Sequence, residues 1–119
     1  MTSLLTNTGI TDAEWIRSTV EESRSDPVGM WRMVRAGREQ FSLVDGKLEE
    51  FVRRFVTEMI EAGAVPVVGD KAAAFGWSPL LKYGNDPAGA ADALVREWLD
   101  SHVDPNIDGV WFAFPAVWK

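Results

Sequence analysis

The segment KLEEFVRRFVTEMIEAG, residues 47–63, limits the fold more than any other part of the chain. Its large apolar residues recur at the three- and four-residue spacing of one helix face. They are Leu48, Phe51, Val52, Phe55, Val56, Met59 and Ile60. Each would contribute about 1.5–3 kcal/mol if fully buried, and such a stripe can be buried only against other elements. The sequence therefore predicts a central core helix that ends at Gly63.

A second helix has a strong start signal near the N-terminus. Thr11 can accept a hydrogen bond from the amide of Glu14, whose side chain can reach back in a capping box. Ile10 is placed to act as the hydrophobic staple. The pattern predicts a helix from Asp12 to about Arg24, with one narrow apolar face.

The dipeptide Asp-Pro stands at 26–27 and again at 86–87. In both places it can supply an N-cap followed by proline at the first helical position. The first copy predicts a helix of about ten residues that Gly37 ends. The second predicts a helix that reaches Ser101 or His102.

Three segments are typical of strands. GREQFSLVDG carries Phe41, Leu43 and Val44 between polar residues and predicts a short strand there. AVPVVGD, residues 64–70, predicts another, in which Pro66 favours an edge position or a bulge because proline cannot donate to the ladder. GVWFAFP, residues 109–115, is apolar on both faces and predicts an interior strand. Residues 71–85 show no steady period, and we expect mostly loop.

The expected order is α, α, β, α, β, loop, α, β. It predicts an α+β fold in which three to four helices pack on one face of a small, partly antiparallel sheet of three or four strands. A chain of 119 residues can bury one core, so we expect a single globular domain over residues 1–119. Residues 1–9 are a candidate disordered segment.

Composition removes several classes of function. The chain has no cysteine, which excludes disulfides, thiolate metal sites and cysteine nucleophiles. Its net charge of −6 repels nucleic-acid phosphates over most of the surface. It shows neither the pattern of a signal peptide nor an apolar run that could cross a bilayer. We therefore expect a cytoplasmic protein that does not associate with membranes.

The stretch DPNIDG, residues 104–109, opens like a calcium loop. The twelfth position of such a loop needs a glutamate, and here it is Pro115. The residues after Gly109 belong to the apolar strand segment. We interpret the stretch as a turn between helix and strand, with Asn106 and Asp108 folding back on the backbone, and we expect neither a metal nor a cofactor.

Two alternative functions rest on single features. His102 is the only histidine, and with the flanking Asp100 and Asp104 it could serve a small enzyme. No serine or threonine is marked as its nucleophile, so we expect no catalytic residue. The other alternative is a helix-turn-helix-like nucleic-acid binder that uses three arginines at three-residue spacing, Arg32, Arg35 and Arg38.

The leading hypothesis rests on six tryptophans and six phenylalanines. Rings of this kind are enriched at contact surfaces, and the segment FGWSPLLKYG gathers several of them outside regular structure. The predicted binding residues are Phe75, Trp77, Leu80, Tyr83, Trp111 and Trp118. The hypothesis is a small acidic protein-binding domain of the accessory, inhibitor or immunity type, without catalysis, and it leaves self-association open.

Overall fold

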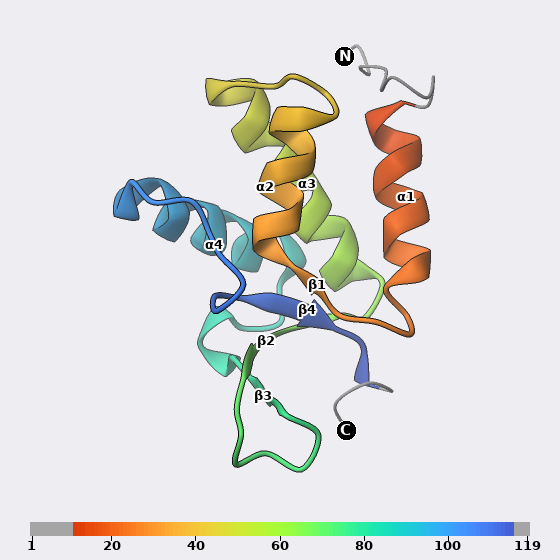
Figure 1. Ribbon diagram of the computed structural model, residues 1–119, viewed down its shortest axis with the longest axis vertical. Helices are drawn as coiled ribbons and strands as arrows, with labels where there is room; N and C mark the ends of the chain where they lie inside the picture. The colour runs from red at the N-terminus through yellow and green to blue at the C-terminus, as the bar shows by residue number, and fades with distance from the viewer. Residues whose placement is uncertain (1–10, 116–119) are drawn as a thin grey trace.

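The computed structural model describes residues 11–115 (Figure 1). The helices are α1 (Asp12–Glu22), α2 (Met30–Glu39), α3 (Asp45–Glu61) and α4 (Pro87–Ser101). The strands are β1 (Val28–Gly29), β2 (Val65–Gly69), β3 (Trp77–Pro79) and β4 (Trp111–Ala113), and a 3-10 turn, η1, covers Leu81–Tyr83. The predictions for residues 1–9, for Ile10 as a staple and for Trp118 concern residues outside this range.

The predicted α+β class is confirmed. The strands form one sheet in the order β1-β4-β2-β3, and every neighbouring pair is antiparallel. Helices α1, α2 and α3 stand together on one side of the sheet, α4 packs against α3, and the β2–β3 hairpin extends away from the helices (Figure 1). No helix in residues 11–115 combines the length and the apolar run that crossing a membrane needs.

Helix α3 is the core helix that its periodicity predicts. Six of its seven apolar residues are buried, and Ile60 is partly buried against the same core. The ring of Phe55 meets Trp15 of α1 edge-on at 5.4 Å and Phe51 at 6.1 Å. Gly63 ends the helix with a φ of 113°, a left-handed conformation that glycine adopts without steric cost. The core of this single-domain fold is thus built around α3.

Of the three predicted helix caps, those at Thr11 and Asp86 are confirmed. The Thr11 hydroxyl oxygen accepts from the Glu14 amide at 3.1 Å, and the same hydroxyl donates to the Glu14 carboxylate. At the start of α4, the Asp86 carboxylate accepts from the Gly89 amide at 2.9 Å. The chain leaves α4 at His102, whose φ of 57° is left-handed. The helix therefore ends where it was predicted to end, at Ser101 or His102.

The predicted start of the helix after the first Asp-Pro pair is wrong. The Asp-Pro pair at 26–27 does not cap a helix, and α2 begins only at Met30. The two residues between them form β1 and pair with Phe112 and Trp111 of β4. Pairing with a strand more than eighty positions away therefore overrides the local helix-start signal. The sequence of this segment alone does not indicate that pairing.

The predicted stop at Gly37 is also wrong, because α2 continues through it to Glu39. This glycine serves close packing. A Cβ at position 37 would lie 2.6 Å from Leu48 Cδ1 and 3.0 Å from the ring of Phe51. Its missing side chain lets α2 approach α3 more closely than any larger residue would allow.

Residues 41–44 do not form the predicted strand. Phe41 and Leu43 are buried, but their amides donate back to carbonyls in the last turn of α2 instead of to a neighbouring strand. Ser42 between them has a φ of 54°, which tightens this turn. The alternation of apolar and polar residues is thus real, but it comes from a tight connection into α3.

Strand β2 is not the edge strand that Pro66 suggested. It lies between β4 and β3. The Pro66 carbonyl accepts from the Leu80 amide at 2.8 Å, one residue beyond the end of β3. In an antiparallel strand, the nitrogen and the carbonyl of one residue face the same neighbouring strand. The N–H that Pro66 lacks would therefore face Leu80, which lies beyond the end of β3. Strand β3 itself lies inside the segment expected to be loop, whereas β4 is interior as predicted.

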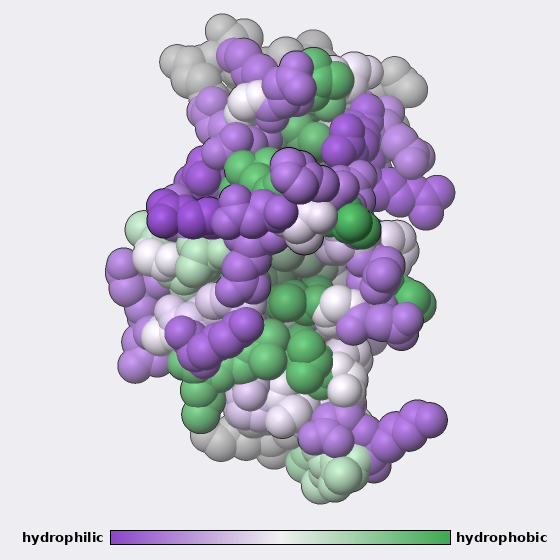
Figure 2. All heavy atoms as spheres, turned by 90° about the vertical axis from the view of Figure 1, so that its left-hand side faces the viewer, coloured by the Kyte–Doolittle hydropathy of each residue, from purple (hydrophilic) through white to green (hydrophobic). Residues whose placement is uncertain are grey.

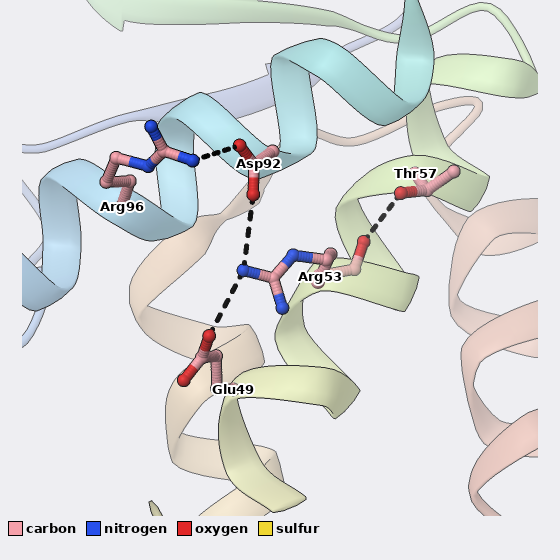
Figure 3. A network of polar contacts seen from close by, with 5 residues as sticks. All are labelled: Glu49, Arg53, Thr57, Asp92 and Arg96. Carbon is pink, nitrogen blue, oxygen red and sulfur yellow. Dashed lines mark hydrogen bonds and ion pairs between the residues drawn. The ribbon is translucent and has the colours of Figure 1, made fainter. Parts of the chain in front are cut away.

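Ion pairs join the two longest helices (Figure 3). Arg53 of α3 reaches Glu49 at 3.1 Å and Asp92 of α4 at 3.5 Å, and Asp92 also binds Arg96 at 2.7 Å. The Arg53 side chain keeps 37% of its surface exposed, so water screens these pairs. Each pair therefore adds at most about 1 kcal/mol to the stability of the fold.

Replacing Arg53 by methionine is expected to lower the free energy of unfolding by only about 0.5–1 kcal/mol, because the aliphatic stem still packs while the screened pairs are lost. Urea denaturation at low and high salt measures this. The difference between the variant and the parent should shrink at high salt, where the pairs are screened. A loss that is independent of salt would contradict the ionic account.

Candidate aromatic binding face

The sheet has a second face, turned away from the core. Phe112 lies in the core cluster. Because successive strand residues point to opposite faces, Trp111 and Ala113 point to the other side. Trp111 is opposite Gly29 of β1 and Val67 of β2 in the sheet register. Side chains on this second face therefore surround Trp111.

Three tryptophans cross this face in a line, which we name the tryptophan row: Trp31, Trp111 and Trp77. Trp31 meets Trp111 edge-on at 6.4 Å and 71°, and Trp111 meets Trp77 at 5.4 Å and 52°. All three are partly exposed. The buried N–H of Trp31 finds no hydrogen-bond acceptor within residues 11–115.

Local structure holds the row in place. Gly29 leaves room for the first ring, since a Cβ there would lie 2.4 Å from two atoms of the Trp31 indole. The indole N–H of Trp111 donates to the Ile107 carbonyl at 2.8 Å. Trp77 is the first residue of β3 and pairs with Gly69 of β2. Three segments far apart in sequence, β1 with α2, β3, and β4, thus place these rings side by side.

The structure brings together only some of the predicted binding residues. Trp77 and Trp111 are neighbours in the row, and Phe75, two residues before Trp77, is 58% exposed. Leu80 is partly buried beyond the end of β3. Tyr83 packs against the core, and its hydroxyl donates to Glu97 at 2.8 Å.

The Tyr83 hydroxyl is held by its surroundings within the fold. Burial raises the pKa of its phenol above the ordinary value, and the hydrogen bond to Glu97 and the negative charge of that carboxylate raise the pKa further. The hydroxyl therefore stays protonated and held. Trp31, in contrast, was missed by sequence reasoning, because only the pairing of β1 with β4 brings it to this face.

Other large apolar residues are exposed around the loop after β2 and the end of α4, with exposed fractions between 40% and 79%. They are Phe75, Leu81, Leu99, Val103 and Ile107. On the side that carries α4, Figure 2 shows a hydrophilic band at the height of α4 and hydrophobic residues gathered below it, at the height of η1 and the sheet.

A hollow adjoins the row where α2 faces the turn after α4. Two neighbouring hollows of about 400 Å³ and 220 Å³ share Trp31, Arg35 and Glu39, and we name them together the α2 cleft. The remaining lining residues are Val34, Arg38, Asp104, Pro105, Asn106 and Ile107 in the larger hollow and Arg32, Ala36 and Gln40 in the smaller. The cleft has apolar walls and charged residues along them.

The DPNIDG stretch is the turn that its sequence indicated, and it forms the far wall of this cleft. The Asn106 side chain accepts from the Asp108 amide at 2.8 Å, and the Asn106 carbonyl accepts from the Gly109 amide at 3.0 Å. The Asp104 carboxylate accepts from the Trp98 indole N–H at 3.0 Å and from Arg38 at 3.1 Å. Within residues 11–115, no group of three acidic or histidine side chains is placed to hold a metal ion.

His102 and the three arginines of α2 are the residues on which the two alternative functions rest. His102 is exposed and lines neither hollow of the α2 cleft. Arg35 pairs with Glu39 at 3.1 Å. With Arg38 bound to Asp104, only Arg32 of the three arginines has no ion pair within the described chain. The basic face is therefore interrupted by acids.

Proline closes an edge of the sheet. The Gly76 carbonyl accepts from the Asp70 amide, and the Leu80 amide donates to the Pro66 carbonyl, so both residues turn backbone groups toward the β2 side. Because this direction alternates along a strand, the backbone groups of Trp77 and Pro79 face away from β2. Pro79 has no N–H to offer there, which hinders the addition of another strand.

No family model matches the chain, and comparisons with curated proteins and with solved structures find no match either.

Proposed function

We propose that this protein acts by binding another protein through the tryptophan row and the adjoining Phe75. It would serve as a small accessory, inhibitor or immunity-type domain without catalysis. The observation that carries the proposal is the row itself. Three partly exposed indoles pack against one another, with centroids 5.4 Å and 6.4 Å apart, on the sheet face opposite the core.

The packing of the rings favours a protein partner. Tryptophan is over-represented among the residues that dominate binding energy at interfaces, because a large rigid ring buries much area at little entropic cost. Each indole here is already held by its neighbour, so binding would fix few additional rotamers. Pro79 makes strand addition at β3 unfavourable, and we infer that side chains rather than backbone make the contact.

The alternatives receive less support. A nucleic-acid binder needs a continuous basic surface, and ion pairs with Glu39 and Asp104 interrupt the arginines of α2. The net charge of −6 adds to this. An enzyme built on His102 needs a pocket around that residue, whereas His102 is exposed at the end of α4.

The test is affinity capture from host lysate with the tagged chain, followed by mass spectrometry, with and without nuclease. We expect one protein to be enriched in both conditions. Replacing Trp77 by alanine should weaken its capture about tenfold or more, because the variant removes one end of the row. Thermal unfolding should show nearly the midpoint of the parent, since Trp77 lies at the sheet edge and is partly exposed.

The matched control is Val44→Ala, which removes an apolar side chain that is 62% exposed and lies outside the row. It should bind as the parent does. A Trp77→Ala midpoint lowered by about ten degrees would show that Trp77 acts as a core residue. Enrichment that disappears with nuclease would favour the nucleic-acid alternative instead.

A further inference from the structure

The α2 cleft has the opposite charge to the chain as a whole. The chain carries 18 acidic and 12 basic side chains. The cleft is lined by three arginines and only two acids, Glu39 and Asp104. Both acids are already ion-paired, to Arg35 and Arg38, so the positive charge of Arg32 is left unbalanced within the described chain. An anionic group is the complementary occupant.

The apolar wall of the cleft is built before any ligand arrives. Asp104 ties the turn to α4 through Trp98 and to α2 through Arg38. The Ile107 carbonyl ties it to β4 through Trp111, while the Ile107 side chain remains 65% exposed. A wall fixed at both ends loses little freedom when a ligand binds against it.

We propose that the α2 cleft binds an acidic peptide segment of the protein partner. One large apolar side chain of the segment lies between Trp31 and Ile107, and a neighbouring carboxylate lies beside Arg32 and Arg35. The larger hollow, about 400 Å³, has the size of pockets that enclose small ligands. This inference rests on the proposed protein-binding function and names the chemistry of the partner.

Position and charge both favour a peptide over a nucleic acid. Trp31 belongs to the tryptophan row and also lines both hollows, so one partner segment can run continuously from the row into the cleft. Guanidinium groups pair with carboxylates in a two-pronged geometry, and a peptide needs only one or two such contacts. A phosphate backbone would need many, against a net charge of −6.

The test is selection of peptides from a random display library on the full chain. We expect the enriched peptides to carry aspartate or glutamate next to a large apolar residue. Arg35 lines both hollows, and Arg35→Glu should weaken binding of those peptides about tenfold. Arg17→Glu makes the same charge change on the exposed surface of α1 and should leave their affinity unchanged.

Three outcomes would overturn the inference: no enriched peptide, enrichment without acidic residues, or equal loss in both variants. Labelled oligonucleotides, single- and double-stranded, form a further arm. Their binding at physiological salt, abolished by Arg35→Glu, would also overturn it. If lysate capture still depends on Trp77 while any of these outcomes occurs, the protein-binding function stands and only the chemistry assigned to the cleft fails.

Discussion

Replacing Phe55 by alanine is expected to lower the free energy of unfolding by about 3–5 kcal/mol, the usual cost of deleting a buried aromatic ring. Phe55 is fully buried at the centre of α3. Its ring packs edge-on against Trp15 and Phe51, so the deletion loses aromatic contacts as well as buried area. Domains of this size are stable by about 5–15 kcal/mol, so the variant should lose a large share of its stability.

Urea denaturation followed by far-ultraviolet circular dichroism measures the loss. Val44→Ala is the matched control, because it removes apolar surface from an exposed position just before the same helix, and it should change stability by less than about 0.5 kcal/mol. A Phe55→Ala variant that loses less than about 1 kcal/mol would mean that the core around α3 collapses to fill the cavity.

The elements that the sequence predicted correctly have their causes within a few residues. The apolar stripe of α3, the Thr11 and Asp86 caps and the Gly63 stop are all local patterns, and each forms as expected. They hold because caps and helix faces depend on neighbours three or four positions away. Strand β4 was predicted for a related reason, since a short run apolar on both faces fits best inside a sheet.

The errors occur where distant pairing decides the structure. The Asp-Pro pair at 26–27 is a valid helix start, yet the next two residues pair with β4. Pro66 argues against an interior strand only if its nitrogen faces a partner, and β3 ends before that point. Gly37 resembles a helix stop, but its purpose is the approach of Leu48. The first two outcomes could not be deduced without the sheet order, and the third could not be deduced without the packing of α2 on α3.

The candidate site was predictable to the same extent. The aromatic excess drew attention to Trp77 and Trp111, which are neighbours across the sheet. It also drew attention to Tyr83, whose ring and hydroxyl are used within the fold. Trp31 lies on a helix and carries no mark of its role, because its place depends on Gly29 and on the register of β1.

The turn that forms the wall of the α2 cleft depends on one carboxylate, and removing it should be costly. Asp104→Ala leaves the indole N–H of Trp98, a residue only 8% exposed, without its acceptor. An unpartnered buried donor costs about 1–3 kcal/mol, and the lost ion pair with Arg38 adds up to about 1 kcal/mol. The free energy of unfolding should fall by the sum, as measured by urea denaturation.

Two further variants separate the contributions. Asp104→Asn keeps an oxygen that can accept from Trp98 but loses the charge, so it should cost less than about 1 kcal/mol. Asp108→Ala removes an exposed carboxylate from the same turn and should change stability by less than about 0.5 kcal/mol. If Asp104→Ala behaved like Asp108→Ala, the Trp98 N–H would have another acceptor and the wall would not depend on Asp104. We expect the free energy of unfolding of Asp104→Ala to be far below that of both other variants. This order would mean that Asp104, which resembled a calcium ligand in the sequence, holds the turn between α4 and α2.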